Sequence, residues 1–261
     1  MLLAQITDLH VGVPGSNVDI QCRTTVQLAR AVQHLCRMDP LPDVVLCTGD
    51  LVDEGSPEEY AVLVPMLAAL PMPCYLVPGN HDHRENLRKA FVSHSYLPRD
   101  GFLHYAVDLG PLRLIALDTH VPGAPGGQLC PERLAWLDAR LSEAPDRPTV
   151  LMMHHPPFRT GIERMDEMGL EGSEGMAEVV RRHPQVERIL CGHLHRPIVK
   201  RFGNTVASTC PSTAHQVVLD LRREGRLAIV DEPPACQLHL WNEGLGLVSH
   251  TSYITGEPAR R

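Results

Sequence analysis

Short apolar runs alternate along this chain with stretches whose apolar residues recur at helical spacing, a pattern typical of strands alternating with helices. An amphipathic helix is predicted over residues 21–38, where Leu28, Val32 and Leu35 share one face. A second helix is predicted after the capping box at Ser56, with a kink or break at Pro65. Three continuous apolar runs have the length of buried strands and separate these helices: Leu2–Thr7, Asp43–Thr48 and Cys74–Val77.

The middle of the chain predicts a hairpin, and the part after it predicts further helix and strand units. Leu103–Asp108 and Leu112–Leu117 flank a Leu-Gly-Pro turn and form the hairpin. Two more helices and two more strands follow in alternation: Pro131–Leu141, Thr149–Met153, Glu174–His183 and Val186–Leu190. After residue 196 the apolar segments are short and separated by turns, which predicts several antiparallel strands. This order favours an α/β fold built on mixed sheets with helices outside.

Polar residues of a few kinds follow five of the predicted strands. Ligand sites of open α/β sheets lie just beyond the carboxyl ends of strands, so these residues are expected to meet in one crevice. The alternate spacing in Asp8-x-His10 and His193-x-His195 predicts that each pair points to one side of an extended segment. The five motifs are Asp8-Leu9-His10, Gly49-Asp50, Gly79-Asn80-His81-Asp82, His154-His155-Pro156-Pro157 and Gly192-His193-Leu194-His195.

The residue types in these motifs indicate a pair of divalent metal ions. Seven candidate ligands are too many for one four-coordinate ion, and a carboxylate that bridges two metals resolves the excess. Asp50 is the natural bridge, because Gly49 lets the backbone turn sharply beneath it. The set contains no Cys, which leaves Zn, Mn, Fe or Co open. The predicted ligands are Asp8, His10, Asp50, Asn80, His154, His193 and His195.

Composition and charge restrict the function further. The formal net charge of −7 argues against binding of a nucleic-acid polymer, which needs a basic face. Residues 1–10 lack the basic and apolar regions of a secretory signal. The uncharged stretch Ala61–Asn80 contains four prolines and predicts helix, turn and strand rather than a membrane span. The eight Cys form no CxxC pair, so reduced thiols in a cytoplasm are expected.

At the five motifs the chain resembles the calcineurin-like metallophosphoesterases, over about residues 1–220. Within them it is most similar to bacterial class III cyclic nucleotide phosphodiesterases and glycerophosphodiesterases, through the HHPP and GHLH motifs and the segment around His215. The resemblance implies a four-layer sandwich, with two mixed sheets face to face and helices outside. It also implies that Asp8, His10, Asp50 and His195 hold one metal, and that Asp50, Asn80, His154 and His193 hold the second.

The expected reaction is hydrolysis of a phosphodiester by a hydroxide held between the two metals. His81, next to Asn80, is placed to protonate the leaving group or to bind a phosphate oxygen. Asp53 is expected to orient His81 and to raise its pKa. Asn80, His81 and His215 are the predicted substrate contacts, and His155 is predicted to support the site or to pack.

Two other functions remain open at this stage. One is a broad-specificity phosphomonoesterase or protein phosphatase. Unlike a phosphodiesterase, it would prefer p-nitrophenyl phosphate to bis-p-nitrophenyl phosphate. The other is a non-catalytic metal-binding scaffold, in which one of the metal-ligating residues would be missing. Residues 1–220 are predicted to form the catalytic domain, and residues 221–261 to complete the sandwich, cap the site or oligomerise. The resemblance implies a homo-oligomer.

Overall fold

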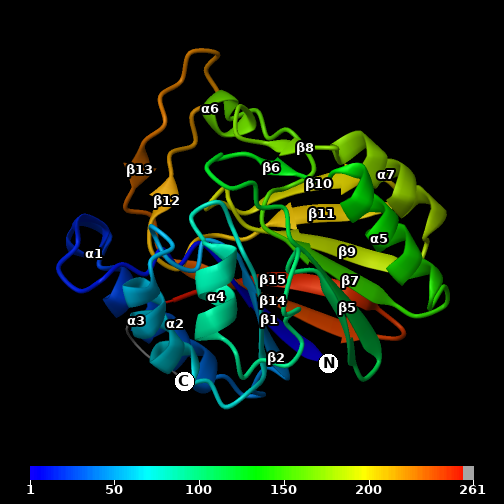
Figure 1. Cartoon of the computed structure of the whole chain (residues 1–261), viewed down its shortest axis with the longest axis horizontal. Helices are drawn as coiled ribbons and strands as arrows, with labels where there is room; N and C mark the ends of the chain where they lie inside the picture. The colour runs from blue at the N-terminus through cyan, green and yellow to red at the C-terminus, as the bar shows by residue number, and fades with distance from the viewer. Residues whose placement is uncertain (255–261) are drawn as a thin grey trace.

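The computed structural model describes residues 1–254, which form two mixed β-sheets placed face to face with helices on their outer sides (Figure 1). The first sheet has the order β15-β14-β1-β2-β3. Its strands are β1 (Leu2–Ile6), β2 (Val44–Thr48), β3 (Cys74–Val77), β14 (Ala235–Asn242) and β15 (Gly246–Tyr253). β1, β2 and β3 are parallel, whereas β14 is antiparallel to β1 and to β15.

The second sheet has the order β10-β11-β9-β7-β5-β4. β5, β7, β9 and β11 run parallel, and β4 and β10 close the two edges antiparallel. Its strands are β4 (Tyr105–Leu109), β5 (Leu112–Leu117), β7 (Thr149–Met153), β9 (Val186–Cys191), β10 (Ile198–Phe202) and β11 (Thr205–Thr209). Two short pairs lie outside the sheets: parallel β6 (Gly127–Gln128) with β8 (Leu170–Glu171), and antiparallel β12 (Gln216–Val217) with β13 (Ile229–Val230).

The helices cover the outer faces of the two sheets in two groups (Figure 1). α2 (Thr24–Cys36), α3 (Pro57–Leu67) and α4 (Arg84–Ala90) lie beside the first sheet, and α5 (Pro131–Ser142) and α7 (Ser173–Arg182) beside the second. α1 (Asn17–Cys22) and α6 (Glu163–Asp166) are short and lie at the end of the molecule where β12 and β13 are found. The expected four-layer sandwich is confirmed, as are the two predicted helices α5 and α7 within one residue.

Two expectations about the first helices need correction. The helix predicted over residues 21–38 is two helices, because Arg23 takes a left-handed conformation (φ 51°) that ends α1 and caps α2. Of the kink or break expected at Pro65, the break is absent, since α3 continues to Leu67. Pro65 lies in the last turn, where its missing N–H removes a single helical hydrogen bond. The capping box is present: Ser56 and Glu59 bond each other's backbone N–H.

Hydrophobic residues form two large cores and one small one. The first fills the space between the two sheets and extends beneath α2 and α3, and the second lies between the second sheet and helices α5 and α7. The small cluster joins Ile162, Met165, Leu194 and Val217 at the end of the molecule that carries the polar motifs. Among the described residues, no helix is long and apolar enough to cross a membrane. The domain boundary expected at residue 220 stays a prediction. The last residues of the expected C-terminal segment, 255–261, lie outside the described part.

Candidate metal centre

The seven predicted ligands lie together where the carboxyl ends of the two sheets meet. β1 leads to Asp8 and His10, β2 to Asp50 and β3 to Asn80, all from the first sheet. β7 leads to His154, and β9 leads to His193 and His195, from the second. The ligands are buried, and only Asn80 is partly exposed. Parallel strands place their carboxyl ends at one edge of a sheet, so strand order gathers the ligands of each sheet, and the face-to-face packing of the two sheets brings the two sets together.

The backbone at the site is not extended as the alternate spacing suggested. Asp8, His10, His193 and His195 all have positive φ, between 43° and 70°, and so does Asp50. Each such non-glycine residue costs about 1–2 kcal/mol relative to its ordinary conformation. Of the six non-glycine residues with positive φ in the described chain, only Arg23 lies outside the predicted ligands. This strain is concentrated at the site, as is typical of functional sites.

Two glycines leave the space that the site needs. A Cβ on Gly79 would lie 2.1 Å from Oδ1 of Asp50. A Cβ on Gly49 would lie 2.4 Å from Nδ1 of His154, and the positive φ of Gly49 (92°) makes the sharp turn ahead of Asp50. The expectation that Gly49 lets the chain turn beneath Asp50 is therefore confirmed.

Three Nε2 atoms converge on the two buried carboxylates. Nε2 of His10 lies 3.6 Å from Oδ2 of Asp50 and 3.3 Å from Nε2 of His195, which lies 3.4 Å from Oδ1 of Asp8. On the other side, Nε2 of His154 lies 3.3 Å from Oδ2 of Asp50 and 3.1 Å from Oδ1 of Asn80. Oδ2 of Asp50 thus lies between the group that contains His10 and His195 and the group that contains His154 and Asn80.

Each of these imidazoles has its Nδ1 occupied by an acceptor. Nδ1 of His10 donates to Oδ1 of Asp53 (3.1 Å), and Nδ1 of His195 donates to the carbonyl of His215 (2.8 Å). Nδ1 of His154 donates to the carbonyl of Thr48 (2.8 Å). An Nδ1–H that is held in this way leaves the Nε2 lone pair free to bind a metal. In the neutral rings of His10 and His195 two lone pairs then face each other across 3.3 Å, which a cation between them would relieve.

Among the described residues, the two buried carboxylates of the site face histidines rather than Lys or Arg. Burial raises the pKa of Asp8 to about 7, with the charge of Asp50 adding to the effect. Burial opposes the charged form of His154, but Asp50 raises its pKa to about 9. Burial holds the pKa of His10 and of His195 well below the usual range. Within residues 1–254, no Lys or Arg forms an ion pair with Asp8 or Asp50, so these residues fit a site for divalent cations.

His193 uses its other ring nitrogen. Its Nε2 lies 3.1 Å from the carbonyl of Met168, which leaves Nδ1 as its free ring nitrogen. Its ring centroid lies 5.1 Å from that of His154 and 4.6 Å from that of His155. His193 can therefore contribute to the group around His154.

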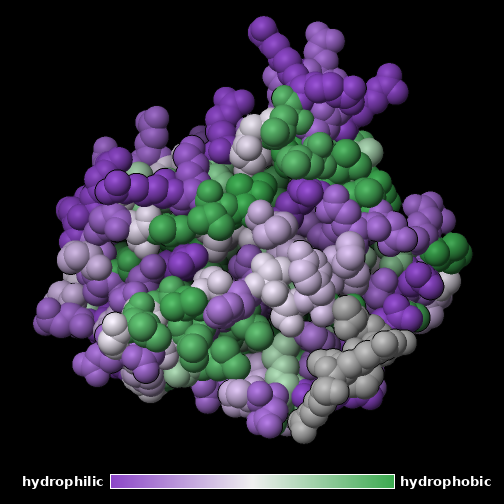
Figure 2. All heavy atoms as spheres, turned by 180° about the vertical axis from the view of Figure 1, so that it is seen from behind, coloured by the Kyte–Doolittle hydropathy of each residue, from purple (hydrophilic) through white to green (hydrophobic). Residues whose placement is uncertain are grey.

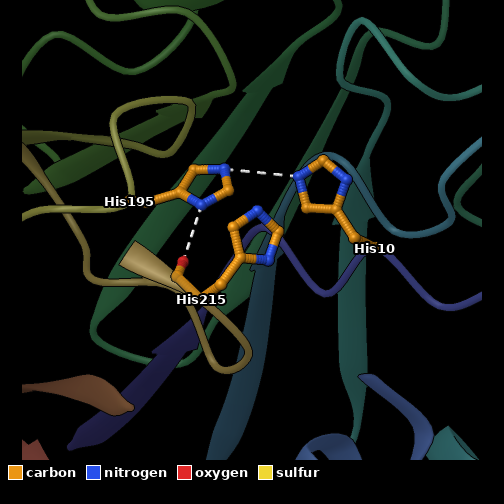
Figure 3. A group of neighbouring side chains, drawn as sticks. All are labelled: His10, His195 and His215. Carbon is orange, nitrogen blue, oxygen red and sulfur yellow. Dashed lines mark hydrogen bonds between the residues drawn. The ribbon is translucent and has the colours of Figure 1, made fainter. Parts of the chain in front are cut away.

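His81, Asp53 and His215 lie at the outer side of the same cluster. Nδ1 of His81 donates to the backbone carbonyl of Asp53 (2.6 Å), whereas the Asp53 carboxylate is 3.9 Å from it and closer to His10. Burial lowers the pKa of His81, but the charge of Asp50 and the Asp53 carbonyl outweigh it, and the net shift is upward. His215 lies with its ring 5.2 Å from that of His10 and 4.7 Å from that of His195 (Figure 3).

Two neighbouring residues support the site through hydrogen bonds. Nδ1 of His155 accepts from the Thr119 hydroxyl (2.8 Å), and its Nε2 donates to the carbonyl of Pro125 (3.2 Å). Asp82, for which no role was predicted, accepts from the backbone N–H of Leu51 and of Gly79. Its place two residues after Asn80 was the only signal in the sequence.

A cavity of about 440 Å³ opens over the cluster. His10, Asp50, Asn80, His193 and His195 form its floor, and His81, Asp53 and His215 line its side. The rest of the lining is largely apolar and comes from α1, from α6 and the turn after it, and from the segment that contains β12 and β13. A pocket of this size accepts a small organic molecule.

Two facing mixed sheets with a His/Asp/Asn cluster at their carboxyl ends define a metallophosphoesterase. Residues 1–197 match the family of calcineurin-like phosphoesterases, and the chain belongs to this family.

Relatives and a solved structure agree with this assignment. A protein of Arcobacter nitrofigilis named "Probable glycerophosphodiester phosphodiesterase GpdQ" is 37% identical over 97% of this chain and 93% of its own length. The 3',5'-cyclic adenosine monophosphate phosphodiesterase CpdA of Pseudomonas aeruginosa is 29% identical over 83% of this chain and 77% of its own. A dimetal phosphatase of Danio rerio shares the fold, with a TM-score of 0.65, 14% identity and coverage of 98% and 99%.

Proposed function

We propose that this chain is a dinuclear-metal-dependent phosphodiesterase that hydrolyses small phosphodiesters, such as 3',5'-cyclic nucleotides or glycerophosphodiesters. The observation that carries the proposal is the convergence of imidazole Nε2 atoms on two buried carboxylates that have no Lys or Arg partner among the described residues. Asp8, His10, Asp50 and His195 would hold one ion, and Asp50, Asn80, His154 and His193 the other. Two divalent ions supply a water nucleophile of lowered pKa and neutralise charge on the phosphoryl group.

His81 is proposed to donate a proton to the leaving oxygen. Its Nδ1 is occupied by the Asp53 carbonyl, so Nε2 is the nitrogen available to the cavity. The hydrogen bond from Nδ1 of His81 to the Asp53 carbonyl favours the protonated ring that a general acid needs. In this arrangement the Asp53 carboxylate orients His10 and the Asp53 carbonyl orients His81. Asn80 and His215 are proposed to contact the phosphate or the groups attached to it.

The lining of the cavity favours a diester over a monoester. It contains no Lys or Arg among the described residues, and therefore offers no fixed positive charge beyond bound metal and His81. A monoester dianion carries about one more charge than a diester monoanion, and each unpaired charge is costly in a partly buried site. A phosphomonoesterase is the less favoured function for this reason.

The test compares two nitrophenyl esters with and without metal. Chelated protein is assayed on bis-p-nitrophenyl phosphate and on p-nitrophenyl phosphate, before and after addition of Mn²⁺, Co²⁺ or Zn²⁺. We expect no activity without metal, restored activity with it, and a higher kcat/KM for the diester. Restored activity that favours the monoester would refute the diesterase, and full metal binding without hydrolysis of either ester would indicate a scaffold.

A second assay isolates His81. A His81→Ala variant should lose more activity on an alkyl diester, whose leaving group needs a proton, than on bis-p-nitrophenyl phosphate, whose leaving group does not. Equal losses on both esters would assign His81 to phosphate binding instead.

Three finer features are part of the proposal. The oxygen and nitrogen donors suit Mn, Fe, Zn or Co, and metal analysis of the purified protein distinguishes them. All eight cysteines are free, which supports a cytoplasmic protein. The protein is proposed to be a homo-oligomer, which light scattering tests. It is also proposed to act on small molecules and to bind neither a nucleic-acid polymer nor a membrane, which binding assays test.

A further inference from the structure

One side of the active-site cavity is apolar and is made by segments that carry no metal ligand. We call it the apolar wall, and it consists of Val18, Met165, Met168, Val217, Leu227 and Ile229. Leu227 and Ile229 are 52% and 53% exposed, which leaves their side chains free to contact a ligand. Seen from behind, hydrophobic surface gathers beneath the segment that projects between β12 and β13 (Figure 2).

The apolar wall rests on a packed base. Met165 and Val217 are 5% exposed and belong to the small hydrophobic cluster that also contains Leu194. Leu194 stands between the proposed ligands His193 and His195, so the cluster joins the wall directly to the metal centre. A wall supported in this way holds its position relative to the metals rather than moving as a loose loop.

Hydrogen bonds fix the β12–β13 segment to the ligand loop. Nδ1 of His195 donates to the carbonyl of His215 (2.8 Å), and Nη1 of Arg196 donates to the carbonyl of Val217 (2.7 Å). The same Nη1 reaches Glu232 (2.9 Å), just beyond β13. Both ends of the segment are thus attached next to a proposed metal ligand.

The groups missing from the cavity narrow the choice of ligand. Its lining within residues 1–254 has no Phe, Tyr or Trp, and its only carboxylates are Asp50 and Asp53, which lie at the metal cluster. A quaternary ammonium or ammonium head group is bound through aromatic faces or carboxylates, and the wall offers neither. Aliphatic side chains instead favour an uncharged group, and the thioethers of Met165 and Met168 make favourable contacts with aromatic rings.

We propose that the apolar wall is the subsite for an uncharged aromatic ring carried by the phosphodiester, such as a nucleobase. This inference rests on the proposed phosphodiesterase function and selects among its substrates. It predicts a preference for a diester that bears such a ring over the same diester without it, and over diesters with a cationic head group.

The experiment uses substrates that differ only in the ring. The metal-loaded full chain is assayed on 3',5'-cyclic AMP, on the same cyclic ribose phosphate without its base, and on glycerophosphocholine, with product measured by ³¹P NMR. We expect kcat/KM for the base-bearing ester to exceed that of each of the others about tenfold, which corresponds to about 1.4 kcal/mol. In the double variant Leu227→Ser, Ile229→Ser the preference should fall to about twofold.

A matched variant and a reference ester separate the outcomes. Leu221→Ser changes an exposed leucine (64%) of the same segment outside the cavity lining, and should keep the tenfold preference. A wild-type preference near one, or a preference that survives the double variant, overturns the subsite while turnover of bis-p-nitrophenyl phosphate upholds the phosphodiesterase. Loss of turnover on all four esters with metal bound overturns the proposed function itself.

Discussion

Asp82 gives the sharpest test of how the protein holds its metal centre in place. Its carboxylate is 3% exposed and accepts three hydrogen bonds, from the N–H of Leu51 (3.1 Å), the N–H of Gly79 (2.8 Å) and the hydroxyl of Tyr60 (2.7 Å). Leu51 follows Asp50 and Gly79 precedes Asn80, so one side chain connects the loops that carry both.

The cost of losing Asp82 follows from the donors left behind. Asp82→Ala removes the acceptor for three buried donors, each worth about 1–3 kcal/mol when unsatisfied, so we expect a loss of about 3–5 kcal/mol in the free energy of unfolding. Asp82→Asn keeps one oxygen for the two N–H donors. Burial already raises the pKa of Asp82 to about 6, so the charge itself adds little, and a loss of about 1 kcal/mol is expected.

The assay is urea denaturation of the chelated protein, which removes the contribution of bound metal. Metal-loaded variants are then assayed for kcat/KM, where Asp82→Ala should lose about 10–100-fold through misplacement of Asp50 and Asn80. Tyr60→Phe serves as a single-bond control, at about 1–2 kcal/mol. An Asp82→Ala variant within 1 kcal/mol of the wild type, or an Asn variant as unstable as the Ala variant, would refute the reasoning.

Three further predictions follow from other parts of the structure. Gly79→Ala should lower metal affinity about tenfold or more by isothermal titration, because its Cβ would lie 2.1 Å from Asp50 Oδ1; unchanged affinity would contradict the close approach. His155→Phe leaves the Thr119 hydroxyl and the Pro125 carbonyl unpaired and should cost about 2–4 kcal/mol in urea unfolding, whereas a neutral result would remove its supporting role. Burial lowers the pKa of His239 to about 3, whereas the unfolded chain has the ordinary value near 6.5. Between these two values the unfolded state binds a proton that the folded state does not, so the free energy of unfolding falls as the pH is lowered from 6.5 toward 3. Stability should therefore decline below pH 6.5 by about 1.4 kcal/mol per unit more steeply in wild type than in His239→Gln, and equal slopes would count against a buried neutral ring.

The sequence predicted the layers of the fold and the residues of the cluster because both follow from short-range patterns. Apolar runs of strand length located β2, β3 and β7 within one residue. Since parallel strands deliver their carboxyl ends to one edge, motifs such as Asp8-Leu9-His10 needed no further information to be placed together. Which of these residues bind metal stays a prediction.

The expectations from the sequence were wrong or incomplete where a residue's conformation or contacts depend on segments far away along the chain. The left-handed φ of Asp8, His10 and His193 cannot be read from alternate spacing, because it is imposed by segments that pack from both sheets. The sequence did not show which part of Asp53 would reach His81: its backbone carbonyl accepts from Nδ1 of His81, whereas its carboxylate lies closer to His10, which follows another strand. Asp82 was placed in its motif without a role, and the apolar wall was not predicted, because residues that they contact lie far away in sequence.

The position of β1 between β2 and β14 sets the order in which its two neighbours can pair with it during translation. Asp8 is synthesised before the other proposed ligands, but the strand before it pairs on one side with β14, and the backbone nitrogen of Met1 donates to the carbonyl of Trp241, 240 positions later. During translation β1 can pair with β2 early, while its other edge stays open until β14 has left the ribosome. The first proposed ligand to be synthesised therefore follows a strand whose second edge is covered only after all the other proposed ligands have been made, and until then that edge is open to pairing with another molecule.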